Sequence, residues 1–106
     1  MSAKIGASAA EMAQALAAGE TTSVELTQAH LERIEAVDGG LNAFLHVASE
    51  SALADAAASD ERRRAGQLSS NLDGVPVAVK DVLTTTGMPT TCGSKILNRF
   101  ATPYDA

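Results

Sequence analysis

Aromatic residues, cysteine and positive charge are all scarce in this 106-residue sequence. It has no Trp, one Cys and three aromatic side chains, and 13 acidic residues outnumber 8 basic ones, for a formal charge of −5. Few, scattered cations give no basic surface for phosphates, so the chain is a poor candidate for binding DNA or RNA by itself. A single cysteine forms no disulfide within the chain, which favours a reducing compartment, and we expect the cytoplasm.

Long apolar runs are also missing. No stretch approaches the roughly 18 apolar residues of a membrane span, and the first residues lack the apolar core of a secretory signal. The two His and the one Cys stand far apart, without the spacing of metal ligands. The sequence therefore predicts no membrane contact and no metal site.

Large apolar side chains are few for this length. Leu, Ile, Val and Phe together number 22, about a fifth of the chain, whereas Ala alone numbers 21. Such a sequence lies just above the level at which chains stay disordered. We therefore expect a piece of something larger, with part of its packing surface supplied from outside these residues.

The composition changes near Gly66. Residues 1–66 are Ala-rich with helical patterns, whereas residues 67–106 are rich in Gly, Pro and Thr. A helix is predicted over residues 51–65, where the arginines at 62–64 suit the negative C-terminal end of a helix. We interpret these arginines as solvated, with a tRNA contact as the alternative.

Two Ser/Thr-x-x-Glu motifs predict two further helices upstream. Ser8 with Glu11 and Thr22 with Glu25 have the spacing of capping boxes, in which each side chain binds a free backbone N–H of the first turn. Gly19 is placed to end the first helix. The pair at 39–40 is placed to end the second.

Two strands are predicted after these helices. Apolar residues alternate with polar ones over residues 41–47, the period of a strand. Residues 75–80, introduced by Asp73-Gly74, are nearly all apolar, which is typical of a strand buried on both faces of a largely parallel sheet. Pro76 belongs at the start of that strand or on an edge. The predicted class is α/β.

Lys80 ends this apolar run. From the pattern alone, such a lysine is a surface residue whose ammonium lies in water. A lysine that acts as a base must instead be buried, so that the pKa of its ammonium falls from about 10.4 by roughly 3 units. Because side chains alternate along a strand, Lys80 and Asp81 point to opposite faces and no ion pair between them is expected.

The string GVPVAVKD, followed by TTTGMPTTCGSKIL and PYDA, resembles the amidase signature family and, within it, the tRNA-dependent amidotransferases. The resemblance covers roughly residues 8–106. It implies a mixed sheet flanked by helices, of which this chain supplies the N-terminal part. On this reading, residues 1–66 form a helical segment of about three helices with the short strand at 41–47. Residues 67–106 begin an incomplete core that includes the lysine strand.

The resemblance also implies a role for Lys80. In this family the lysine of the motif belongs to a Ser–cis-Ser–Lys triad, and both triad serines would lie beyond Ala106. Ser69, Ser70 and Ser94 do not stand in a matching Gly/Ser-rich segment. We therefore expect Lys80 to be catalytic in the complete protein and this chain alone to be inactive.

The implied activity is the release of ammonia from glutamine for the amidation of misacylated Glu-tRNA(Gln) or Asp-tRNA(Asn). Subunits B and C are the implied partners. ATP and Mg²⁺ would act through a partner subunit, and no cofactor is expected in this chain. Two alternatives stay open, namely another amide hydrolase of the same family, and a non-catalytic helical module that binds partner subunits.

The remaining candidates have simpler interpretations. Cys92 has no His nearby in the sequence and fits a small packing residue. His30 and His46 are of the kind more often found at surfaces or satisfied by local hydrogen bonds. The threonines at 84–86 are expected to shape a loop near the site, since their hydroxyls bond readily to local backbone.

Overall fold

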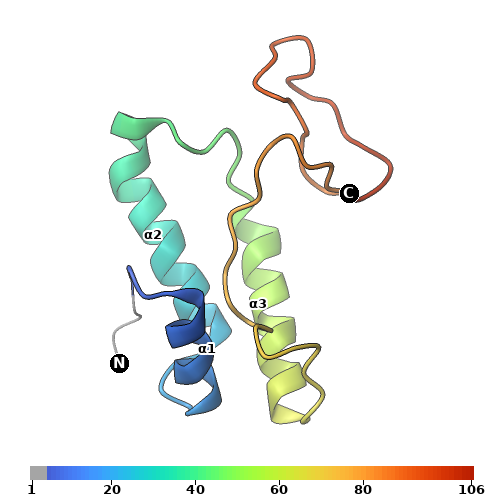
Figure 1. The fold of residues 1–106 in the computed structure, drawn as a ribbon. Coiled ribbons are helices and arrows are strands. Elements are labelled where there is room, and N and C mark those ends of the chain that lie inside the picture. Colours follow the sequence, from blue (N-terminus) through green and yellow to red (C-terminus); the bar gives the residue numbers. More distant parts are fainter. Residues whose placement is uncertain (1–4) are drawn as a thin grey trace.

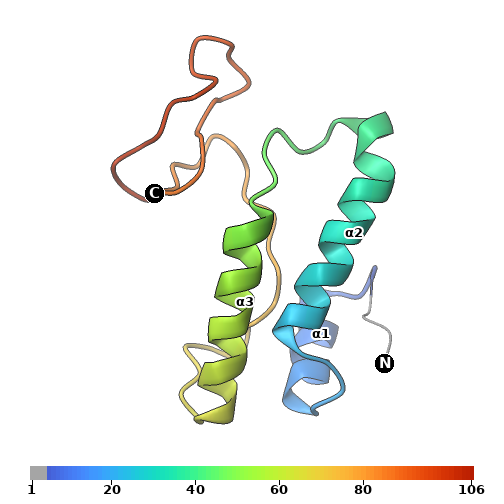
Figure 2. The same cartoon turned by 180° about the vertical axis from the view of Figure 1, so that it is seen from behind.

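The computed structural model describes residues 5–106 and contains three helices (Figure 1). They are α1 (Ala9–Ala17), α2 (Ser23–Leu41) and α3 (Ser49–Arg64). Helices α2 and α3 lie side by side and run in opposite directions, and α1 packs beside the start of α2 (Figures 1 and 2). After α3 the chain returns along that helix and then forms loops beyond its other end.

These loops make the molecule more extended than a closed domain. The radius of gyration of the Cα atoms is 14.8 Å. A compact domain of about 100 residues has a radius of gyration of about 13 Å. The helices therefore form the packed part of the chain, and the loops after residue 80 project from it.

The capping side chains predicted for α1 and α2 are in place. Ser8 Oγ accepts a hydrogen bond from the backbone N–H of Glu11 at 3.1 Å. At α2 the box is complete, because Thr22 Oγ1 accepts from the N–H of Glu25 at 3.1 Å and the Glu25 carboxylate accepts from the N–H of Thr22 at 3.3 Å. Gly19 follows α1 with φ of 74°, as its left-handed stop requires.

Helix α2 ends later than its glycines predicted. The pair at 39–40 is helical, and α2 continues through Leu41. Asn42 then adopts the left-handed conformation with φ of 55°, and its N–H donates to the carbonyl of Asp38 at 2.7 Å. Asparagine tolerates this conformation better than most side chains, so it replaces glycine as the residue that ends the helix.

The strand predicted over residues 41–47 is wrong. Residue 41 belongs to α2, and residues 42–48 have no regular secondary structure. The Asp38 carboxylate accepts hydrogen bonds from the backbone N–H groups of Ala43 at 2.7 Å and Phe44 at 3.3 Å. A side chain at the end of α2 thus binds N–H groups that a strand would have directed to a neighbouring strand.

Helix α3 matches the helix predicted over 51–65, but its C-terminal arginines are not all solvated. Arg62 donates from Nε and Nη2 to the carboxylate of Asp73 at 2.8 and 2.7 Å, and Arg63 Nη2 donates to the Asp73 carbonyl at 3.0 Å. The same carboxylate accepts from Ser59 Oγ at 2.7 Å and from the N–H of Ser69 at 3.0 Å. We call these five residues the Asp73 clamp.

The clamp stabilises the ionised form of Asp73. The hydrogen bonds from Arg62, and then those from Ser59 and Ser69, hold the pKa of the Asp73 carboxyl well below its usual range. The same interaction raises the pKa of Arg62. The side chain of Asp73 is 5% exposed. The clamp therefore fixes the chain that follows α3 onto the end of that helix.

Gly74 lies where this returning chain meets all three helices. Its carbonyl accepts a hydrogen bond from Ser23 Oγ at 2.7 Å, and its φ is 100°. A Cβ atom at this position would lie 2.9 Å from Ser59 Oγ, 3.2 Å from Leu16 Cδ1 and 3.3 Å from Ser23 Cβ. Only glycine fits both the backbone conformation and the space.

A second long-range contact joins α3 to the first turn of α2. The Asp60 carboxylate accepts from the backbone N–H groups of Ser23 at 2.8 Å and Val24 at 3.1 Å. These donors have no partner within α2, and a negative charge is favourable at a helix N-terminus. Asp60 therefore completes the capping of α2 from the neighbouring helix.

The buried apolar core is small, as the composition predicted. It is formed by side chains of α1 and α2 with two partly buried neighbours, namely Met12, Leu16 and Leu26 with Ala7 and Val75. Large apolar residues elsewhere are open to solvent, with Leu41 71%, Val77 78% and Ile96 94% exposed. Much of the apolar surface of this chain is thus left without a packing partner within residues 5–106.

The strand predicted at the lysine is not formed in the described part of the chain. Residues 75–80 run without regular secondary structure, and the one β pairing within residues 5–106 is an antiparallel bridge between Pro89 and Ala101. A strand needs a neighbour for its N–H and C=O groups. Residues 5–106 provide none for this run, so they form a helical arrangement rather than the expected α/β sheet. The division into segments 1–66 and 67–106 stays a prediction.

Candidate active site around Lys80

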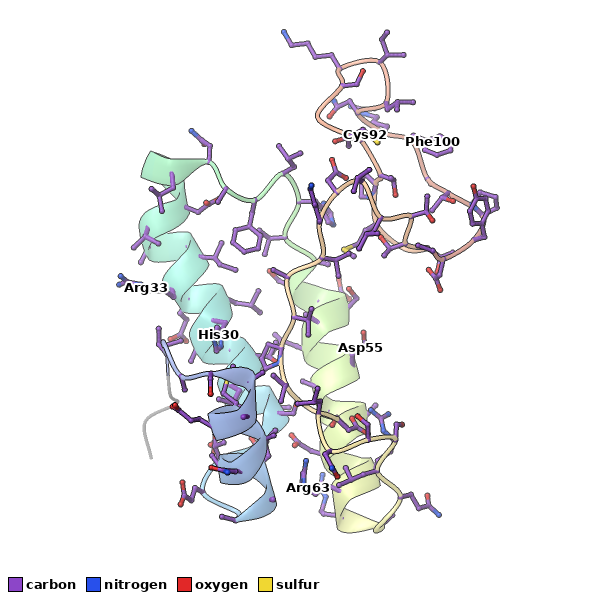
Figure 3. The ribbon with its side chains drawn as sticks, in the orientation of Figure 1. His30, Arg33, Asp55, Arg63, Cys92 and Phe100 are labelled. Atoms are coloured by element: carbon purple, nitrogen blue, oxygen red, sulfur yellow. The ribbon has the colours of Figure 1, made fainter. Side chains whose placement is uncertain are left out.

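Lys80 lines an open groove with a volume of about 920 Å³. Its walls come from residues 43–46, from residues 78–81 and from the loop that follows, up to residue 99. The groove lies beyond the start of α3, at the opposite end of that helix from the Asp73 clamp (Figures 1 and 3). The chain from the clamp to Lys80 therefore spans the length of α3.

The Lys80 side chain is exposed to solvent. Within residues 5–106 it has no hydrogen-bond or ion-pair partner. Its carbonyl accepts a hydrogen bond from the N–H of Leu83 at 3.0 Å, so Lys80 begins a tight turn. The burial that a lysine base requires is not provided by this part of the chain.

Asp81 joins the Lys80 turn to the turn over residues 91–94, which lines the same groove. Its carboxylate accepts hydrogen bonds from the backbone N–H of Thr91 at 2.9 Å, from the Thr91 hydroxyl, and from the N–H of Gly93 at 3.4 Å. The two bonds from Thr91 are the main reason that the pKa of the Asp81 carboxyl is lowered. The carboxylate therefore faces Thr91 and Gly93 rather than Lys80.

The loop beyond Asp81 is a sharp turn. The N–H of Ser94 donates to the carbonyl of Thr91 at 2.8 Å, and Cys92 and Gly93 have left-handed φ values of 52° and 69°. Thr91, Gly93 and Ser94 all line the groove. The sequence analysis missed Asp81 as the residue that holds this turn. The sequence signal for this role is a carboxylate ten residues before a Thr-Cys-Gly-Ser sequence that is typical of a turn.

The C-terminal residues fold back onto the Thr-rich loop. The Asp105 carboxylate accepts from the backbone N–H of Thr86 at 2.7 Å and from its hydroxyl at 3.1 Å. The N–H of Ala106 donates to the carbonyl of Thr84 at 2.7 Å. The motif PYDA thus closes the loop that carries one wall of the groove.

The three serines considered in the sequence lie in different places. Ser94 lines the groove with Lys80, whereas Ser69 belongs to the Asp73 clamp. Ser70 Oγ accepts from the N–H of Leu72 at 3.1 Å in the turn between Ser69 and Asp73. Among the described residues, no serine hydroxyl is bonded to Lys80, so the structure assembles no nucleophile and base pair here.

Of the two histidines, His46 lines the groove with Lys80, whereas His30 does not. The Nδ1 atom of His30 lies 2.7 Å from the carbonyl of Leu26 on its own helix, a local contact. Cys92 is a free thiol exposed on the turn, and Figure 3 shows it with Phe100 in the projecting loops.

In residues 5–106, no three His, Cys, Asp or Glu side chains come close enough together to hold a metal ion. The helices of the same residues include none that is both long and apolar enough to cross a membrane.

The chain belongs to the amidase family, whose model matches residues 25–106. This range contains α2 from its third residue onward, all of α3, the Asp73 clamp and the groove with Lys80.

Similar curated proteins carry the name of the A subunit of glutamyl-tRNA(Gln) amidotransferase. The protein of this name from Nocardia farcinica is 63% identical over 99 residues, which are 92% of this chain and 20% of that protein. The protein from Streptomyces coelicolor is 56% identical over 106 residues, which are 100% of this chain and 21% of that protein. The chain thus spans about a fifth of the length of these relatives.

A solved structure has the same arrangement. It is reported as an unexpected vestigial protein complex that reveals the evolutionary origins of an s-triazine catabolic enzyme. It superposes with a TM-score of 0.86 at 35% identity over 94% of this chain and 22% of its own. The three helices and the returning chain are therefore an arrangement found within a longer protein.

Proposed function

We propose that this chain is the N-terminal portion of the glutaminase subunit of a tRNA-dependent amidotransferase. The observation that carries the proposal is the 56% identity to the Streptomyces coelicolor relative over all 106 residues. The residues that form the groove lie inside the range that matches the amidase family. This supports a catalytic subunit over a separate helical module.

In the complete protein, Lys80 would act as the base of a Ser–cis-Ser–Lys triad. Neutral Lys80 accepts a proton through the bridging serine, and the nucleophilic serine attacks the carboxamide carbon of glutamine. The C–N bond breaks, ammonia leaves with a returned proton, and water releases glutamate from the acyl-enzyme. Both serines come from chain outside these 106 residues, so we expect no glutaminase activity from this chain alone.

The burial of Lys80 would also come from chain outside these 106 residues. The surface around it includes exposed Val77 and Val79, 78% and 46% exposed, and the groove is open. Covering these side chains would remove water from the lysine as well, which favours its neutral form. The thin core and the solvated lysine thus have one explanation, a missing packing partner.

The ammonia would pass to a partner subunit that activates misacylated tRNA with ATP and Mg²⁺. Subunits B and C are the proposed partners, Glu-tRNA(Gln) or Asp-tRNA(Asn) the acceptor, and the cytoplasm the location.

A chimera tests the proposal. This chain replaces the matching residues of the Streptomyces coelicolor relative, which is then produced with its partner subunits and assayed for ammonia released from glutamine. We expect activity within about tenfold of the host protein. Lys80→Met in the chimera should lower kcat by about 10⁴-fold or more, the scale of losing a triad member.

Lys95→Met is the matched control, because Lys95 lines the same groove and the substitution removes the same positive charge. We expect it to leave kcat within about threefold. Equal losses in the two variants, or a folded chimera without glutaminase activity, would contradict the proposal and favour a non-catalytic module. A chimera that hydrolyses glutamine but does not support amidation of Glu-tRNA(Gln) would favour another amide hydrolase.

A further inference from the structure

Asp81 occupies an unusual place in the groove, because it connects two tight turns that both line it. One turn begins at Lys80, whose carbonyl accepts from Leu83. The other begins at Thr91, whose carbonyl accepts from Ser94. The Asp81 side chain bonds to Thr91 and Gly93 of the second turn, and these hydrogen bonds connect the two turns.

The geometry of these bonds leaves little freedom. One carboxylate oxygen accepts from the N–H of Thr91 at 2.9 Å, and the other accepts from the Thr91 hydroxyl and the N–H of Gly93. The Thr91 hydroxyl in turn accepts from the N–H of Gly93 at 3.2 Å. Two carboxylate oxygens with three donors fix the orientation of the Asp81 side chain as well as its position.

Lys80 is covalently next to this fixed point. Its backbone position is set on one side by Asp81 and on the other by the segment that begins at the Asp73 clamp, seven residues earlier. Between these two anchors, residues 75–80 have no regular secondary structure of their own. The place of the lysine at the groove therefore depends on Asp81 more directly than on any other described side chain.

We propose that Asp81 is a positioning residue for Lys80. It holds the Lys80 turn against the turn over residues 91–94, so that the lysine ammonium reaches the reacting groups from a fixed direction. The inference rests on the proposed function of Lys80. It adds to that function the residue through which the lysine is aligned, and Asp81 itself touches neither substrate nor the reacting atoms.

The test uses the active chimera with partner subunits, and kcat is normalised to the number of active sites titrated by acyl-enzyme formation. Asp81→Ala removes all three bonds and should lower kcat per active site by about 100-fold, the scale of a misplacement of about 1 Å. The KM for glutamine should stay within about threefold. Asp81→Asn keeps one acceptor oxygen for the Thr91 N–H, so it should recover at least tenfold of the loss.

Asp105→Ala is the matched control. Asp105 also accepts from a threonine N–H and hydroxyl, those of Thr86, but neither residue lines the groove. We expect kcat per active site within about twofold of the unmodified chimera. A decrease equal to that of Asp81→Ala would show that any loop anchor has this effect and would overturn the inference.

A pair of milder variants decides the question if Asp81→Ala does not fold. Thr91→Val removes one hydroxyl bond to Asp81 and should lower kcat per active site by about five- to tenfold, whereas Thr86→Val should change it by less than twofold. No difference between these two variants, or an Asp81→Ala chimera within threefold of the unmodified kcat per active site, would refute the inference. An inactive unmodified chimera would instead refute the proposed function.

Discussion

Replacing Gly74 by alanine is the substitution whose cost follows most directly from the structure. The new Cβ atom would lie 2.9 Å from Ser59 Oγ and 3.2 Å from Leu16 Cδ1, closer than ordinary contacts. Overpacking of this kind costs about 1–3 kcal/mol. Both neighbours are held in place, Ser59 by its bond to Asp73 and Leu16 by its burial at 1% exposure.

Backbone strain adds to this clash. Gly74 has φ of 100°, which a residue with a Cβ atom adopts at a cost of about 1–3 kcal/mol. Alanine also lowers the conformational entropy of the unfolded chain, which stabilises the folded state by about 0.4–1 kcal/mol and offsets part of this cost. Taking the middle of each of these ranges, we expect Gly74→Ala to lower the free energy of unfolding by about 3 kcal/mol, a large part of the stability of a small domain.

Urea unfolding followed by far-UV circular dichroism measures this loss. With an m-value of about 1.5 kcal/mol/M, the midpoint should fall by about 2 M. Gly66→Ala is the matched control, because Gly66 also has a positive φ, of 69°, but a Cβ atom there meets nothing within 4 Å. It should cost about 1 kcal/mol, because this variant has the backbone strain without the clash. Equal midpoints for the two variants would refute the clash argument.

Two further predictions concern the stability of the helices and of the clamp. Gly39→Ala should raise the free energy of unfolding by about 0.5–1 kcal/mol, because Gly39 is helical with open space around it, and thermal unfolding that shows no gain would contradict this. Because the pKa of Asp73 is lowered in the folded state, its stabilising effect is complete above its unfolded pKa of about 3.9 and is lost as pH falls below that value. Urea midpoints from pH 6 down to pH 2.5 should therefore fall less steeply for Asp73→Asn than for the unmodified chain, and parallel curves would show that the clamp does not depend on this carboxylate.

The sequence alone determined the features that depend on near neighbours. The starts of α1 and α2 were predicted because a capping box needs only residues three apart, as Thr22 and Glu25 are. The length of α3 followed from its composition up to Gly66. The motif with Lys80 could also be assigned to the amidase family from the sequence alone. The resemblance depends on a contiguous string of residues, and this string lies in the range that the family model matches.

The errors arose where a local pattern lacked its long-range partner. Alternating residues over 41–47 have the period of a strand, but a strand forms only against a neighbour. Here the Asp38 carboxylate accepts from the N–H groups of Ala43 and Phe44 instead. The run at 75–80 failed for the same reason. Within residues 5–106 it has no strand beside it, so periodicity predicted a capacity to pair rather than a formed sheet.

Only the tertiary structure decided what the charged residues do. Arg62 and Asp73 are 11 residues apart, and Asp60 binds the N-terminus of α2 from a distance of 36 and 37 residues along the chain. Asp81 meets Thr91 across ten residues of loop. A carboxylate has the same sequence signature whether it is solvated, capping a helix or anchoring a turn, because its role depends on which donors the fold brings within about 3 Å.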